Sequence, residues 1–163
     1  MQKFIPSLFI QESAENIVIF ESRIGFYLQH MQPESKQKLW NRWLKKYWQQ
    51  RLDNVPVALH EDESAQMLDW LPSLGDAYPE AVSLAVRLPG NHIDHCHFLF
   101  HDLRESDLVT LYPNETADLL NYLCNCAVGY HIEDLKIIND RLPELTPDMR
   151  YKLDNALARI GAK

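Results

Sequence analysis

The chain has 163 residues, an apolar fraction of 46 % and a formal net charge of −7 at pH 7. This length and composition predict one globular domain over residues 1–163 with a hydrophobic core. Only five glycines and nine prolines are present, which excludes a collagen-like or low-complexity chain, and the negative charge argues against a general nucleic-acid binder.

Apolar residues recur at helical spacing along nearly the whole chain. Ser13 is placed to cap the first helix and Thr146 the last. Pro72 is expected to shorten or kink the helix that contains it. Residues 91–102 are predicted to be less regular, and residues 107–112 form a short turn. The predicted helices cover about residues 14–31, 33–53, 62–74, 79–88, 115–128, 132–142 and 147–160.

The helix over residues 33–53 is the segment around which we expect the others to pack. Three of the four tryptophans, Trp40, Trp43 and Trp48, fall on its apolar face at 100° per residue. One aromatic side chain can bury ~150–250 Å². This helix is therefore predicted to supply much of the local core.

The fold predicted from these patterns is all-α, since no segment shows the period-2 alternation of a β-strand. Prolines mark four predicted helix starts, at Pro33, Pro79, Pro113 and Pro147, with separations of 46, 34 and 34 residues. That spacing is typical of helix-pair repeats. Two architectures remain open: stacked helix pairs, as in a HEAT-like α-solenoid segment, or an irregular helical bundle.

The polar face of the 33–53 helix is a candidate partner-binding surface. The segment carries six lysines and arginines against two acids. Such a face could contact phosphates or an acidic protein surface, although a solvated outer face is the commoner reason for this pattern. The candidate residues are Lys38, Arg42, Lys45 and Lys46.

Four of the seven histidines lie within ten residues, at His92, His95, His97 and His101. His97 and His101 would share one face of a helix, a spacing that zinc can use. However, no glutamate follows the first histidine as a metalloprotease helix requires, and no paired CxxC supplies thiolates. We therefore expect a solvated or locally hydrogen-bonded cluster, and no metal or other cofactor.

The three cysteines do not suggest a disulfide framework, because their number is odd and two lie two residues apart in a helix. Cys124 and Cys126 point ~200° apart on a helix, so at most one is expected in the core. The chain shows no secretion signal and no apolar run long enough to span a bilayer. These features predict a cytoplasmic protein without a membrane partner.

No arrangement typical of an active site is present. The chain has no glycine-rich phosphate loop and no GxSxG motif. Clustered acids at helix starts are explained by the helix dipole. The residues alone predict a non-enzymatic helical domain.

Four segments in order carry a family resemblance: RWLKKYWQQRL, MLDWLPSLGDAYPEAVSLAVRLP, LFHDLRESDLVTLYP and ADLLNYLCNC. Together they resemble the helical C-terminal region, of unknown function, of large bacterial proteins that carry a sirtuin-like NAD-consuming domain and look like anti-phage defence systems. The resemblance covers about residues 15–160. It implies a non-catalytic sensor, scaffold or oligomerisation module whose enzymatic partner lies upstream or on another protein.

Three functions follow as hypotheses, besides a metal-dependent enzyme built around His92 to His101, which the missing motifs disfavour. The first is a protein-interaction or sensor module of a defence-type protein, which binds a protein partner or a second copy of itself. The partner could be an NAD-consuming or other effector domain. The second is an immunity protein that neutralises a toxin by direct binding, and the third is a nucleic-acid-binding module that uses the basic face of the 33–53 helix.

Overall fold

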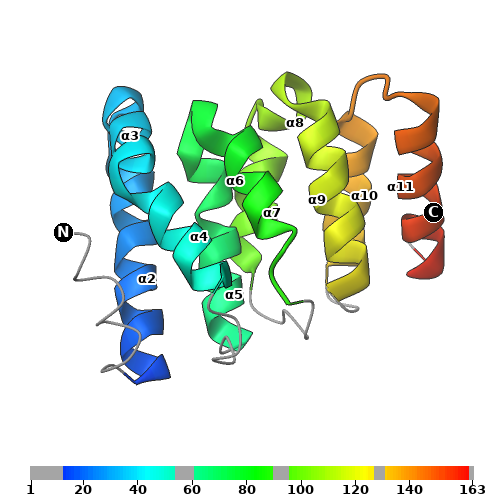
Figure 1. Ribbon diagram of the computed structural model, residues 1–163. Coiled ribbons are helices and arrows are strands. Elements are labelled where there is room, and N and C mark those ends of the chain that lie inside the picture. Colours follow the sequence, from blue (N-terminus) through cyan, green and yellow to red (C-terminus); the bar gives the residue numbers. More distant parts are fainter. Residues whose placement is uncertain (1–12, 54–60, 90–95, 127–130, 162–163) are drawn as a thin grey trace.

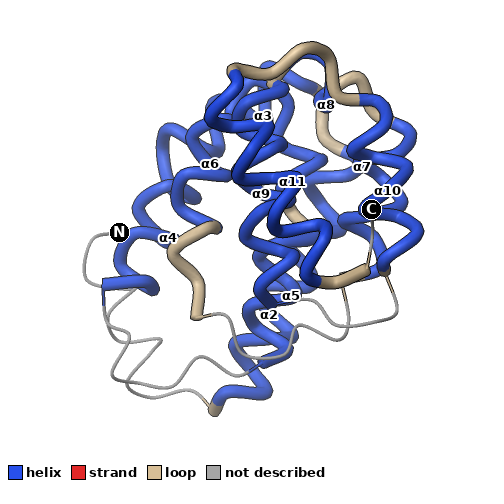
Figure 2. The backbone as a smooth tube through the Cα atoms, turned by 90° about the vertical axis from the view of Figure 1, so that its right-hand side faces the viewer, coloured by secondary structure: helices blue, strands red, loops and turns tan. Residues whose placement is uncertain are grey.

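The computed structural model describes residues 13–53, 61–89, 96–126 and 131–161. Every regular element within these ranges is a helix (Figure 2). The predicted all-α fold is confirmed.

The helices form two layers that follow the chain from one end of the molecule to the other (Figure 1). In each layer a helix packs against the next one. The first layer contains α2 (Ala14–His30), α5 (Glu61–Asp69), α7 (His97–Glu105) and α10 (Ile132–Arg141). The second contains α4 (Lys45–Asp53), α6 (Tyr78–Ala85), α9 (Pro113–Cys126) and α11 (Pro147–Arg159). The helices are therefore arranged in layers along the chain, and a repeat of helix pairs stays a prediction.

The predicted 33–53 helix is continuous but contains an irregular turn. It comprises α3 (Pro33–Leu39), a π-helical segment η1 (Trp40–Leu44) and α4, and the N–H of Lys45 bonds to the carbonyl of Trp40 five residues earlier. Trp40, Tyr47 and Trp48 are fully buried, as the apolar stripe predicts, while Trp43 is only partly buried. The ring of Trp48 lies 5.6 Å from that of Trp70, which joins this helix to the following segment.

Pro72 interrupts the helix predicted over residues 62–74. The α-helix α5 ends at Asp69, and a 3₁₀ segment, η2 (Leu71–Ala77), follows. Proline cannot donate to an α-helical ladder and disfavours helical backbone in the residue before it, which explains the change. Gly75 (φ 57°, ψ −123°) then breaks η2 in a conformation essentially restricted to glycine.

The prediction for residues 91–102 was wrong over its second half, where α7 begins at His97. Leu99, Phe100 and Leu103 are buried along one side of this helix. Residues 90–95 lie outside the described ranges. The predicted caps are confirmed, since the Ser13 and Thr146 hydroxyls accept hydrogen bonds from the backbone N–H groups of Asn16 and Met149.

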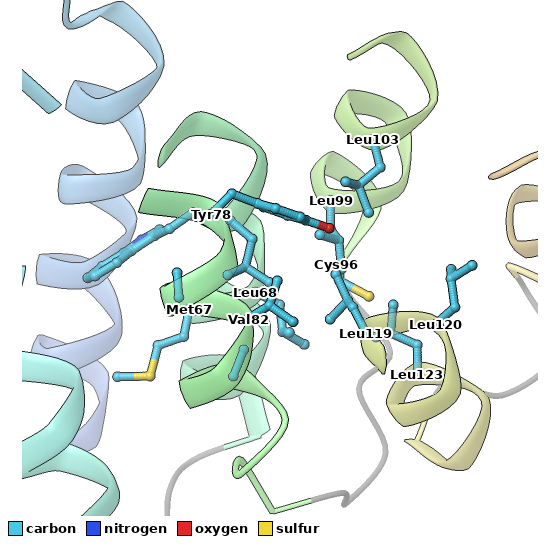
Figure 3. Packing of buried hydrophobic residues seen from close by; sticks show 14 of the residues in the cluster. Met67, Leu68, Tyr78, Val82, Cys96, Leu99, Leu103, Leu119, Leu120 and Leu123 are labelled. Atoms are coloured by element: carbon cyan, nitrogen blue, oxygen red, sulfur yellow. The ribbon is translucent and has the colours of Figure 1, made fainter. Parts of the chain in front are cut away.

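One connected core runs between the two layers. Its central part joins α5, α6, α7 and α9 (Figure 3). The expectation that at most one of Cys124 and Cys126 is in the core was wrong, because both thiols are buried. The reason is that α9 lies between α6 and α11 and therefore has two covered sides. The short helix α8 (Leu108–Leu111) completes the link from α7 to α9.

Candidate functional site

An open groove of about 740 Å³ lies between α3 and α7. A smaller hollow of about 150 Å³ adjoins it and shares Lys36, Pro72 and Ser73. We call the larger hollow the α3–α7 groove. It is lined by Gln29, Lys36, Pro72, Ser73, Phe98, His101, Asp102, Glu105 and Ser106.

Side chains from neighbouring helices cap both ends of α7, the helix that forms one wall of the groove. Cys96 precedes α7 but provides no side-chain cap. Instead, Asp69 Oδ1 of α5 accepts a 2.9 Å hydrogen bond from the backbone N–H of Leu99. At the other end Arg141 of α10 donates to the carbonyls of Leu103 and Ser106 at 3.1 and 2.8 Å. An acid at the N-terminus and a cation at the C-terminus both suit the helix dipole, so these contacts stabilise α7 and tie it to α5 and α10.

The floor of the groove is η2. Pro72 and Ser73 sit where the 3₁₀ segment replaces a regular helix. A 3₁₀ turn is tighter than an α-helical one. The sequence signal for this floor is Pro72 itself, which predicted only a shortened or kinked helix.

The two walls carry opposite charges. Lys36 on α3 is partly buried, which lowers the pKa of its amine, and it forms no ion pair with another residue in the described ranges. On α7, Asp102 shares a hydrogen bond with His101 at 3.1 Å, and Glu105 lies one turn further on. Burial raises the pKa of nearby Asp69 to about 7, and the charge of Asp102 adds to this rise.

An aromatic side chain completes the groove. Phe98 on α7 is 62 % exposed although its neighbour Leu99 is fully buried. An exposed aromatic ring at the edge of a concave surface is typical of a protein-contact site, where aromatic residues often dominate the binding energy. The groove therefore offers an apolar anchor on the same helix as the acidic Asp102 and Glu105, with Lys36 contributed by α3.

The predicted basic site is only partly free. Lys38, Arg42 and Lys46 are exposed and form no ion pair within the part of the chain that the structure describes. Lys45 instead pairs with Glu80 of α6, and this carboxylate also accepts a 2.6 Å hydrogen bond from Trp40 Nε1. Three of the four predicted residues thus remain available to a partner.

The structure brings none of the predicted histidines into a ligand set. His92 and His95 lie outside the described residues, and only the backbone of His97 is described. His101 is exposed and hydrogen-bonded to Asp102. Among the described side chains, no group of three or more His, Cys, Asp or Glu is arranged to hold a metal ion.

Both neighbouring cysteines of α9 have thiols that resist ionisation. Burial raises the pKa of Cys124 to about 11 and also raises that of Cys126. A thiol is nucleophilic only as the thiolate. The geometry of α9 therefore places these cysteines in the core rather than in a reactive site.

No helix within the described ranges has the length and apolar character needed to cross a membrane. Comparison with protein-family models matches residues 2–156 to the family described as "Domain of unknown function (DUF4020)". No curated protein matches, and no solved structure does so either. Because the family match covers nearly the whole sequence, the chain belongs to the DUF4020 family.

Proposed function

We propose that this domain is a non-catalytic protein-interaction or sensor module of a bacterial anti-phage defence-type protein, and that it binds its partner in the α3–α7 groove. The observation that carries this proposal is Phe98, an exposed aromatic ring in a groove whose two walls bear opposite charge. Stacked helix pairs commonly bind proteins on extended concave surfaces of this kind.

The chemistry of the groove specifies the partner segment. An apolar side chain would pack on Phe98, an acidic group would face Lys36, and a basic group would face Asp102 and Glu105. The ammonium of Lys36 is partly desolvated and forms no ion pair among the described residues, so it would gain from an acidic ligand, since charge pairs strengthen where water is excluded. Opposite charges on the two walls also fix the direction in which a segment binds.

The defence context is supported by the order of the four family-like segments and is consistent with the family match. On this proposal the partner is an NAD-consuming or other effector domain, on the same chain or on another protein, or a second copy of this domain. All three cysteines are buried thiols, which is compatible with the reducing cytoplasm in which such a system would act.

Affinity measurements on the purified complex test the proposal. The partner is first isolated by co-purification and identified, and its dissociation constant is then measured for wild type, Phe98→Ala and Lys36→Glu. Loss of a central contact residue typically costs about 2 kcal/mol, so we expect at least about 30-fold weaker binding for Phe98→Ala.

Tyr151→Ala is the matched control, because Tyr151 is 69 % exposed, close to the 62 % of Phe98, but lies on α11 at the far end of the stack. This variant should bind as wild type does. The groove is excluded as the contact surface if all three variants keep full affinity, and a toxin as the recovered partner would favour the immunity-protein hypothesis instead.

A further inference from the structure

A cluster of polar side chains is buried between α2, α4 and α5. Glu21 comes from α2, Tyr47 and Arg51 from α4, and Glu63 from α5. Glu21, Arg51 and Glu63 are 0 %, 2 % and 0 % exposed. Tyr47 donates a 2.6 Å hydrogen bond to Glu21 Oε1, and Trp70 Nε1 donates to the backbone carbonyl of Glu21 at 3.0 Å. Helix α2 is thus joined to the stack through Glu21.

The charges in this cluster do not balance if both carboxyl groups are ionised. Arg51 donates from Nε to Glu63 Oε1 and from Nη2 to Glu63 Oε2, and the Nη2–Oε2 distance is 2.5 Å. The Arg51 charge offsets that of Glu63, so a second buried carboxylate would leave the cluster with a net negative charge. Such a charge is costly in a protein interior, and the usual outcome is that the group takes up a proton.

Helix α5 and segment η2, which pack against α2 in the described ranges, contain no lysine, arginine or histidine. Segment η2 contributes one carboxylate, Asp76, which is exposed and accepts a hydrogen bond from Tyr112. The groups that act on Glu21 are Glu63, Tyr47 and Arg51, and burial is the largest effect, so the pKa of Glu21 is raised well above its ordinary value. The pKa of Tyr47 is raised as well, which keeps its phenol protonated as a donor.

One oxygen of Glu21 shows where the proton belongs. Oε2 is buried and receives no hydrogen bond from the described residues, whereas Oε1 accepts from Tyr47. A carboxyl group protonated at Oε2 becomes a donor, and the neighbouring Glu63 carboxylate is an acceptor.

We propose that Glu21 is protonated at neutral pH and donates a hydrogen bond to Glu63. This bond acts as a latch that holds α2 against α4 and α5, and ionisation of Glu21 loosens α2. Gln29 of α2 also lines the α3–α7 groove, so loosening α2 would alter the lining of that groove. The latch stands on the buried contacts alone and does not depend on what the groove binds.

The sign of the pH dependence follows from the raised pKa. Between the ordinary glutamate pKa of 4.5 and the folded-state value, the folded chain holds a proton that the unfolded chain has released. The stabilisation is complete below pH 4.5 and is lost as the pH rises through the folded-state pKa. Within that interval the folding equilibrium constant should fall by up to about tenfold per pH unit from this group.

Denaturant unfolding from pH 5 to pH 10 tests the latch, with wild type, Glu21→Gln and Glu15→Gln compared at each pH. The amide that Glu21→Gln introduces would still accept from Tyr47 and donate to Glu63, but it cannot ionise. We expect Glu21→Gln to lose the alkaline fall in stability and to exceed wild type at high pH. Glu15 is an exposed carboxyl on the same helix, so Glu15→Gln should keep the wild-type pH profile.

Hydrogen exchange locates the effect, since α2 amides of wild type should lose protection at high pH before those of α9. Parallel pH profiles for wild type and Glu21→Gln would overturn the proposal. If Glu21→Gln does not fold, infrared spectra of wild type with carbon-13 glutamate decide the question. The label separates glutamates from Asp69; a protonated glutamate band at pH 7 supports the latch, and its absence contradicts it.

Discussion

The indole Nε1 of Trp40 donates a 2.6 Å hydrogen bond to Glu80 Oε2 and so joins the 33–53 helix to α6 across 40 residues of sequence. Lys45 donates to the other oxygen of the same carboxylate. The partly exposed carboxylate of Glu80 therefore accepts hydrogen bonds from both the buried Trp40 indole and Lys45, a predicted partner-binding residue. The arrangement explains why Lys45 is less available to a partner than the other basic residues.

The two interactions of Glu80 should contribute unequally to stability. Glu80→Ala leaves the N–H of the buried Trp40 without its acceptor, which typically costs about 1–3 kcal/mol. Lys45→Ala removes only a half-exposed ion pair, worth less than ~1 kcal/mol. Denaturant unfolding of both variants measures the difference; equal losses would show that the indole bond contributes nothing beyond the ion pair.

Asp69 should make the stability of α7 depend on pH near neutrality. Its pKa is about 7 in the folded chain against an ordinary value of 3.8, mainly through burial. The stabilisation from its bound proton is complete below about pH 4 and is lost as the pH rises through 7. Asp69→Asn keeps an acceptor for the N–H of Leu99 and cannot ionise.

We therefore expect Asp69→Asn to become progressively more stable relative to wild type between pH 4 and pH 8. Unfolding curves at intervals of one pH unit check this, and carbon-13 NMR of the Asp69 carboxyl reads the titration directly. An NMR midpoint near pH 4, together with a stability difference that is constant with pH, would refute it.

Much of the fold could be predicted from one sequence because each helix has a strong local pattern. The tryptophan stripe identified the face that Trp40, Trp48 and Tyr47 bury, and Ser13 and Thr146 were recognised as caps. Such signals depend on neighbours within one or two turns. The start of α7 was missed because its capping acceptor, Asp69, belongs to another helix.

The candidate site could not be predicted in the same way. The α3–α7 groove collects Lys36, Phe98 and Asp102 from helices about 60 residues apart in sequence, and no local pattern links them. At most one of Cys124 and Cys126 was expected in the core because a single helix has one obvious buried side, whereas α9 is covered on two. Which sides of a helix are covered depends on its neighbours in the folded stack, and the spacing of apolar residues within that helix does not reveal it.

The basic face should bind nucleic acid weakly or not at all. Of the six cations in residues 33–53, Arg51 is buried against Glu63 and Lys45 pairs with Glu80. Few phosphate contacts remain, and their contribution falls steeply with salt. We expect titration with duplex and single-stranded DNA, at low and moderate salt, to show either no binding or weak binding that Arg42→Glu leaves unchanged. Tight binding that is lost in Arg42→Glu would restore the nucleic-acid hypothesis.

Elemental analysis of the purified protein checks the expectation that the histidines His92 to His101 hold no metal. We expect no stoichiometric zinc or iron, because His101 is exposed and bonded to Asp102. One equivalent of zinc that disappears in His101→Ala would contradict this and would identify a metal site near the start of α7.

Site-specific photo-crosslinking tests most directly whether the α3–α7 groove holds the partner. A photoreactive phenylalanine derivative replaces Phe98 in one protein and Tyr151 in another, and both are irradiated in cells that contain the partner. We predict a discrete cross-linked protein at position 98 that is lost with Lys36→Glu and is absent at position 151. A complex that co-purifies intact but cross-links only from position 151 would contradict the assignment of the groove.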